Sequence, residues 1–378
     1  MTRSPKISII HFEPELSGYS GHLYNTLETI KKAFLSHGHE YRVVTAPQAQ
    51  SIDNGFLQCE FNFDEMPKYR NTFFGNLFLN PIIYNYKIFK GIISTKIYAD
   101  NVIYFNTCQH LHLIGIAIAC LFKRPNYIVL TFRLDTFSGY RSIPRVAWYF
   151  VGIQLIRLLF NSKTKFVTDS DLLVERFKNI YNLDLKKLPI PHIPNIEETR
   201  NTKQLVTIGS LGPASRPKNV LSTIDALHSI DQKLTHKINY LLYSYGECEK
   251  QINSKLKKLS FYNISFIVKD KPVPYSEYLS DLQSVDIVMT NYIETYYRYN
   301  TSGIFSEAYA LNKIIVTSPD TWMSANSNNC PGVLVLKNQQ DVGRTLIYAL
   351  SNFEKIKRSI SRAYKVDNFY EEFMSLME

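Results

Sequence analysis

A short glycine-containing loop with two basic residues is the clearest candidate for chemistry in this sequence. Gly209 and Gly212 lie at the end of a predicted strand, and Arg216 and Lys218 follow before the next predicted helix. Glycines let a backbone approach an anion closely, and fixed cations with the N–H groups of a helix start can hold phosphates without a metal. The pattern predicts an anion site, although a solvated surface loop would also carry such charges.

A second candidate is the start of a later helix that contains one acidic residue. Thr301, Ser302 and Gly303 could present backbone N–H groups to an anion at this helix start. Glu307 follows among apolar neighbours and adds a carboxylate that can accept two hydrogen bonds. An ordinary surface glutamate is the alternative interpretation.

These residues need a scaffold, and the hydrophobic pattern predicts short apolar strands that alternate with helices. Such alternation is typical of a parallel sheet that is covered on both faces, whose ligands bind at the carboxyl ends of the strands. Strands are predicted at residues 7–12, 41–44, 102–105, 127–131, 165–168, 205–208, 238–243, 264–268, 286–290 and 314–317. Residues of about 50–100 show a less clear secondary-structure pattern and suggest an insertion or a pair of helices.

The length of 378 residues suits two α/β domains. A break is predicted where Pro189, Pro191 and Pro194 force an extended chain. We therefore expect two tandem Rossmann-like, doubly wound domains, over residues 1–190 and 196–358, with an interdomain cleft. A last helix over about residues 360–378 could pack back on the first domain.

Composition narrows the class of protein and its partners. The five cysteines are scattered without metal-ligand spacing, which predicts neither a disulfide framework nor a zinc site, and suggests a reducing cytoplasm. The first residues lack the apolar core of a signal peptide, so export by that route is not expected. The net charge of +10 favours an anionic partner, whether phosphates or a membrane surface, and no motif for nucleic-acid binding accompanies it.

The most apolar stretch, residues 146–160, is too short to span a bilayer. Arg141, Arg145 and Arg157 accompany it and make a basic amphipathic element that could lie on an anionic membrane. A buried helix with arginines near its ends is the other interpretation.

The second half of the chain resembles the donor domain of GT-B glycosyltransferases, particularly the retaining glycosyltransferase family 4, or group 1, of bacterial surface-polysaccharide enzymes. The resemblance covers most of residues 203–350 and depends on the loop at 208–219, the turn at Tyr245 and Gly246, and the segment 302–313. It implies transfer of a sugar from a nucleotide-sugar donor to a saccharide or polyprenyl-linked acceptor in polysaccharide or glycoconjugate assembly. It also implies retention of configuration without a metal or other cofactor.

In that family the basic pair contacts the donor's phosphates and the helix glutamate, here Glu307, faces the ribose. One departure stands eight residues before Glu307, where the family has a second acidic residue and this chain has Tyr299 beside Arg298. Arg298 could reach a phosphate or an acidic sugar instead. The lost acid also leaves open a catalytically silent subunit that binds a glycan or a partner enzyme.

The resemblance implies that the N-terminal domain binds the acceptor. Gly18, Gly21 and His22 form a loop and helix start that could contact an acceptor hydroxyl or a donor phosphate, unless they only shape a turn. Arg133 stands where relatives often carry a histidine that touches the transferred sugar. Asp135 is a candidate base for the acceptor, or a structural cap of the following turn, and an inverting reaction through Asp135 or His22 remains open.

Overall fold

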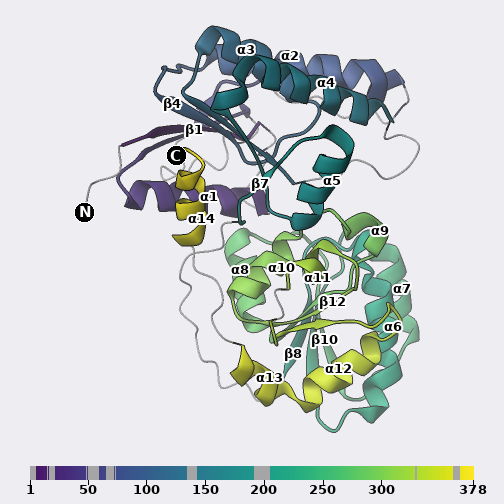
Figure 1. The fold of residues 1–378 in the computed structure, drawn as a ribbon. Helices are drawn as coiled ribbons and strands as arrows, with labels where there is room; N and C mark the ends of the chain where they lie inside the picture. The colour runs from purple at the N-terminus through teal and green to yellow at the C-terminus, as the bar shows by residue number, and fades with distance from the viewer. Residues whose placement is uncertain are drawn as a thin grey trace. The chain divides into compact units, whose positions relative to one another are not determined.

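The chain forms two compact units in the computed structural model (Figure 1). Unit 1 comprises Met1–Pro191 and Val366–Glu378, and unit 2 comprises His192–Lys365. The change between units falls within the proline-rich stretch, and the last helix, α14 (Asp367–Ser375), belongs to unit 1. The structure describes residues 6–14, 16, 22–47, 49, 59–64, 72, 74–133, 143–190, 205–327, 330–360 and 367–378.

Unit 1 is built on a parallel sheet of seven strands in the order β3-β2-β1-β4-β5-β6-β7. The order reverses between β1 and β4, which defines a doubly wound sheet. The strands are β1 (Ser8–Phe12), β2 (Glu40–Thr45), β3 (Cys59–Phe61), β4 (Asn101–Phe105), β5 (Tyr127–Phe132), β6 (Thr164–Thr168) and β7 (Lys186–Lys187). In addition to α14, the α-helices of the unit are α1 (His22–Ser36), α2 (Asn80–Ser94), α3 (Leu113–Lys123), α4 (Ile143–Phe160) and α5 (Asp171–Tyr181).

One face of this sheet is covered by α1 together with α14 from the far end of the chain (Figure 1). Phe369 and Phe373 of α14 are fully buried in the same cluster as Phe34 of α1. The rings of Phe34 and Phe373 lie 5.0 Å apart between centroids, and the hydroxyl of Tyr370 lies 2.7 Å from Nε2 of His39. Residues near the C-terminus therefore complete the core of unit 1.

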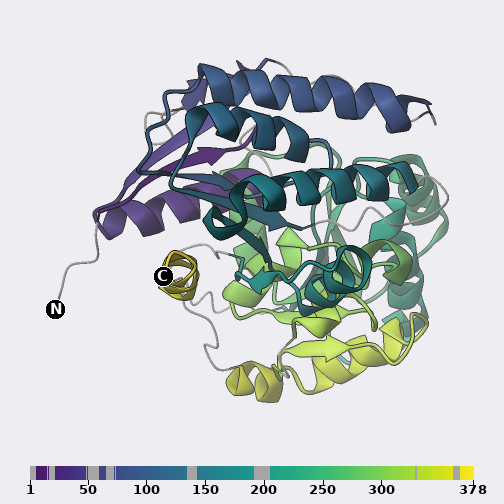
Figure 2. The ribbon, with the colours of Figure 1, turned by 45° about the horizontal axis from the view of Figure 1, so that its top comes forward.

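Helices α2, α3 and α4 lie together in unit 1 (Figures 1 and 2). Glycines allow close packing, because a Cβ at Gly115 of α3 would stand 2.2 Å from the carbonyl oxygen of Asn85 in α2. A π-helical segment, Gly75–Leu79, leads directly into α2. Within its described residues, the stretch at 50–100 thus holds the short strand β3 and one continuous helix rather than two. None of the described helices combines the length and apolarity needed to cross a membrane.

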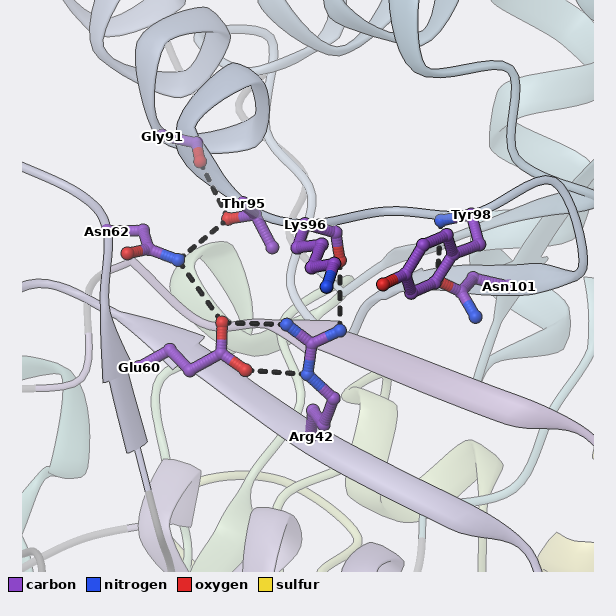
Figure 3. A network of polar contacts seen from close by, with 8 residues as sticks. All are labelled: Arg42, Glu60, Asn62, Gly91, Thr95, Lys96, Tyr98 and Asn101. Carbon is purple, nitrogen blue, oxygen red and sulfur yellow. Dashed lines mark hydrogen bonds and ion pairs between the residues drawn. The ribbon is translucent and has the colours of Figure 1, made fainter.

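A polar network joins the edge of the sheet to the C-terminal end of α2 (Figure 3). Arg42 of β2 donates to both carboxylate oxygens of Glu60 in β3, at 2.6 and 2.8 Å, and to the carbonyl of Lys96 at 2.9 Å. Asn62 donates to Glu60 at 3.2 Å and to the hydroxyl of Thr95 at 3.1 Å. These bonds join the strands β2 and β3 to the residues that directly follow α2.

Unit 2 contains a parallel sheet of six strands in the order β10-β9-β8-β11-β12-β13, which reverses between β8 and β11. Both units therefore have the doubly wound α/β architecture that the sequence predicts. The strands are β8 (Thr207–Ser210), β9 (Ile238–Tyr243), β10 (Ile264–Lys269), β11 (Ile287–Thr290), β12 (Ile314–Thr317) and β13 (Val333–Val335). The helices are α6 (Val220–Ile230), α7 (Glu249–Lys258), α8 (Tyr275–Ser284), α9 (Glu294–Tyr297), α10 (Gly303–Ala310), α11 (Trp322–Ala325), α12 (Val342–Ser351) and α13 (Phe353–Ser359).

Candidate functional site

The carboxyl ends of β8 and β11 mark the point in unit 2 where the strand order reverses, which is where ligands bind in open α/β sheets. The loops that follow these two strands are joined. The backbone N–H of Ile293 donates to the carbonyl of Pro217 at 2.8 Å, and the hydroxyl of Thr223 donates to the side chain of Asn291 at 3.1 Å. The 3-10 turn Arg216–Lys218 is thereby fixed against the loop after β11.

Lys218, Gly212 and the first turn of α10 come together at this point. Gly212 has a φ of +71°, and a Cβ there would lie 2.7 Å from Nζ of Lys218 and 3.1 Å from Cδ1 of Ile304. Nζ of Lys218 also lies 3.4 Å from the carbonyl of Leu211. Only a glycine leaves room for the ammonium group beside the helix start.

The charge of Lys218 is poorly compensated. Its side chain is partly buried, and burial lowers the pKa from its usual 10.5 to about 8. Among the described residues, no carboxylate forms an ion pair with it. A partly desolvated cation gains more from a bound anion than an exposed one does, so this position favours an anionic ligand.

Helix α10 begins at this site with a conventional cap. The hydroxyl of Ser302, which is buried, accepts a hydrogen bond from the N–H of Phe305 at 3.2 Å. Thr301 and Gly303 flank the cap and are partly buried. The positive end of the helix dipole thus lies on the same side as Lys218.

Glu307 lies one turn into α10 and is 6% exposed. The hydroxyl of Tyr278, in α8, donates a hydrogen bond to Oε2 of Glu307. Sequence reasoning missed Tyr278, because the partners lie on different helices and no motif joins them. The bond fixes the orientation of the carboxylate.

Arg216 points elsewhere. Its guanidinium is exposed and lies 3.1 Å from Oε1 of Glu247, whose Oε2 accepts the backbone N–H of Arg216 at 3.2 Å. The two cations of the predicted pair therefore have different surroundings. Arg216 pairs with Glu247, whereas Nζ of Lys218 lies beside Gly212, which also adjoins Ile304 of α10.

Tyr245 and Gly246 shape the loop after β9. The N–H of Ala214 donates to the carbonyl of Tyr245 at 2.7 Å, and the N–H of Cys248 donates to the carbonyl of Ala214 at 3.0 Å. Gly246 has a φ of +115°, and a Cβ there would lie 2.9 Å from that carbonyl oxygen. These contacts hold the loop that carries Gly212.

Gly209 and Arg298 have contacts of their own. A Cβ at Gly209 would lie 2.6 Å from a methyl group of Val285, so packing between the strand and its neighbour accounts for this glycine. Arg298 is exposed and forms an ion pair with Glu294 in α9. Tyr299 follows it and is partly buried.

The carboxyl edge of the sheet in unit 1 carries a buried polar cluster. The first residue after each of four adjacent strands is polar: Glu13 after β1, Asn106 after β4, Arg133 after β5 and Asp169 after β6. All four are at most 4% exposed. Only Arg133 was predicted as a site residue, although the position of the other three directly after apolar strands was a signal that could have found them.

Arg133 contacts two of the other three residues. It donates to the carbonyl of Asn106 at 3.0 Å and to its side-chain oxygen at 2.6 Å, and its Nη1 lies 3.8 Å from Oδ2 of Asp169. Buried charges of this kind are expensive unless they are paired, so the cluster holds Arg133 in one orientation.

The remaining predicted residues are placed only in part. Gly18, Gly21 and Asp135 lie outside the described residues, and His22 begins α1 with only its backbone described. In the described parts of the chain, no group of three histidine, cysteine or acidic side chains is arranged to bind a metal ion.

No protein-family profile and no curated protein matches the sequence. Solved structures match over almost the whole chain. A glycosyltransferase from Rickettsia africae is 12% identical with a TM-score of 0.60, over 99% of this chain and 98% of its own. HepE from Anabaena, in complex with UDP and glucose, is 12% identical with a TM-score of 0.64, over 98% of each chain. A putative UDP-N-acetylglucosamine 2-epimerase from Listeria monocytogenes is 11% identical with a TM-score of 0.64, over 98% of this chain and 95% of its own. These likenesses at low identity show that the chain has the GT-B fold.

Proposed function

We propose that this chain is a glycosyltransferase that takes a sugar from a nucleotide-sugar donor bound to unit 2. The observation that carries the proposal is Lys218, a partly buried cation beside Gly212 and the capped start of α10. The fold supports it, because HepE was solved with UDP and with UDP-glucose, and the neighbours include glycosyltransferases.

Each residue of this site has a role in the proposal. Lys218 and the N–H groups at the start of α10 hold the donor's diphosphate. Glu307 accepts hydrogen bonds from the ribose hydroxyls. When the acceptor's hydroxyl oxygen bonds to the anomeric carbon, the bond to the diphosphate breaks and its electron pair leaves with the nucleotide. The proton of the acceptor hydroxyl passes to the departing diphosphate oxygen. Lys218 and the helix dipole stabilise that developing charge.

The finer features of the proposal rest on the sequence resemblance. The acceptor is a saccharide or a polyprenyl-linked lipid in surface-polysaccharide or glycoconjugate assembly, and the enzyme acts at the cytoplasmic face of the membrane. Transfer needs no metal and retains the anomeric configuration. Arg133 and its buried cluster lie in the unit that would bind the acceptor.

The test begins with thermal unfolding of the full chain against a panel of nucleotides and nucleotide sugars, since a bound ligand raises stability. Each stabilising donor is then incubated with saccharide and short polyprenyl-diphosphate-sugar acceptors, and released nucleotide and product are measured. We expect one nucleotide class to stabilise the chain and release to depend on an acceptor. The Lys218→Met variant should lose both responses, whereas Lys237→Met, at an exposed lysine of unit 2, should keep them.

The other outcomes separate the alternatives. Binding without turnover would indicate a catalytically silent subunit. An epimer formed from UDP-N-acetylglucosamine without any acceptor would indicate an epimerase instead. An inverted product anomer would replace retention by inversion, and no nucleotide binding at all would refute the proposal.

A further inference from the structure

Large apolar side chains are exposed along the helix formed by residues 75–79 and α2. Phe74, Phe78, Ile82 and Tyr86 follow one another at intervals of four residues and are 60%, 45%, 57% and 62% exposed. Residues four apart lie on the same face of a helix. The chain therefore exposes one apolar stripe along this helix.

The two neighbouring helices expose apolar side chains as well. Ile118 and Phe122 of α3 are 40% and 71% exposed, and Phe150 and Leu158 of α4 are 50% and 82% exposed. The opposite face of α4, which includes Ile153, is buried. The predicted amphipathic element therefore has one face in the core and a second apolar face that is exposed.

The three helices are in contact. The rings of Phe89 in α2 and Phe122 in α3 lie 6.4 Å apart between centroids. The indole N–H of Trp148 in α4 donates to the carbonyl of Leu77, before α2, at 2.7 Å. A Cβ at Gly152 of α4 would lie 2.5 Å from the side chain of Leu113 in α3. The exposed side chains of the three helices therefore lie in one part of unit 1, which we call the apolar helix face.

Charge indicates what the apolar helix face binds. The segments Gly75–Leu79, α2, α3 and α4 contain no acidic residue. Their charged residues are all basic: Lys87, Lys90, Lys123, Arg145 and Arg157. Lys90 pairs with Asp64 at 3.0 Å, and Nζ of Lys123 donates to the carbonyl of Thr95 at 2.7 Å. Apolar side chains among basic ones are typical of surfaces that bind anionic membranes, whereas a second copy of this face would bring like charges together.

We infer that the apolar helix face binds the surface of an anionic lipid bilayer. The aromatic and aliphatic side chains enter the boundary between head groups and acyl chains, while the lysines and arginines contact the anionic head groups. The network around Arg42 and Glu60 fixes the C-terminal end of α2 and so keeps the stripe in place. The inference concerns a surface away from the nucleotide site and does not depend on the proposed activity.

Vesicle flotation of the full chain tests it. We expect the protein to float with vesicles of phosphatidylcholine and phosphatidylglycerol, and to float at least tenfold less with phosphatidylcholine alone. The double variant Ile82→Ser with Phe122→Ser should reduce binding to the anionic vesicles at least tenfold. The double variant Tyr262→Ser with Tyr348→Ser, at positions 72% and 55% exposed in unit 2, is the matched control and should bind like the wild type.

Three results would overturn the inference. The first is equal flotation of the wild type and the helix-face variant, and the second is equal flotation with neutral and anionic vesicles. The third is a concentration-dependent dimer in sedimentation velocity that the helix-face variant abolishes, without vesicle binding, which would make the face an interface between copies. Circular dichroism confirms that the variants fold, and nucleotide binding measured on the same samples reports separately on the proposed function.

Discussion

Lys218 links protonation to ligand binding. Its pKa in the free protein is about 8, below the usual value for lysine, and a bound diphosphate favours the charged form. Above pH 8 the ligand must therefore recruit a proton, so the affinity for a nucleoside diphosphate should fall by up to about tenfold per pH unit. UDP, with which HepE was solved, is the probe for these predictions. Calorimetry at pH 7.5 and 9.5 measures this loss. The Lys218→Arg variant stays charged over that range and should show little change, and a wild type equally independent of pH would contradict this role.

Glu307 is expected to recognise the ribose. Replacing it by Gln removes the charge that accepts the ribose hydrogen bonds and should weaken UDP binding about tenfold, or about 1.4 kcal/mol. The comparison ligand is 2′,3′-dideoxyuridine diphosphate, which lacks both hydroxyls. Its affinity should be the same for Glu307→Gln and the wild type. An equal loss of affinity with both ligands would show that Glu307 does not contact the ribose hydroxyls.

Some residues of the candidate site could be predicted from the sequence and others could not. The glycine loop and the helix start were predictable because their spacing has a local cause in turn geometry and capping. Glu13, Asn106 and Asp169 were also open to prediction, since each directly follows an apolar strand. Tyr278 was not, because its bond to Glu307 depends on the packing of α8 against α10.

At the level of elements, the approach of the β8 loop to α10 depends on Gly212. A Cβ there would displace Nζ of Lys218 and meet Ile304 in a backbone conformation that disfavours side chains. We expect Gly212→Ala to cost about 1–2 kcal/mol of stability and to weaken UDP binding at least tenfold. Urea unfolding and calorimetry measure the two effects.

Gly38→Ala is the control for this prediction. Gly38 has a φ of +80°, but a Cβ there would meet nothing within 4 Å. The variant should lose about 1 kcal/mol of stability from backbone strain and keep its affinity for UDP. If both variants bind UDP like the wild type, the loop does not shape the site.

The helices and strands with clear periodicity were predicted closely, and the exceptions have physical reasons. The predicted strand at 238–243 and helix at 220–230 coincide with β9 and α6. The three-residue strand β13 is too short to show a period. Helix α2 could not be predicted from hydrophobic periodicity. Ile88 is buried, while the apolar residues Ile82 and Tyr86 on its other side are exposed, so the helix has no polar face to define a helical pattern.

At the level of the whole molecule, unit 1 depends on the end of the chain. Phe373 of α14 is fully buried against α1. Phe373→Ala should destabilise unit 1 by about 3–5 kcal/mol, since it leaves a cavity in the core. Urea unfolding followed separately for the two units by hydrogen exchange should show the loss in unit 1, with UDP binding to unit 2 retained. An unchanged unit 1 would contradict the role of α14.

Amide hydrogen exchange of the full chain with and without UDP tests the proposed site most directly. We predict that UDP slows exchange in the loop at 210–219 and at the start of α10, residues 301–307, in the wild type, and does so much less in Lys218→Met. A saturating nucleoside diphosphate that stabilises the chain but leaves both segments unprotected, or that protects Lys218→Met equally, would contradict a nucleotide site at this helix start.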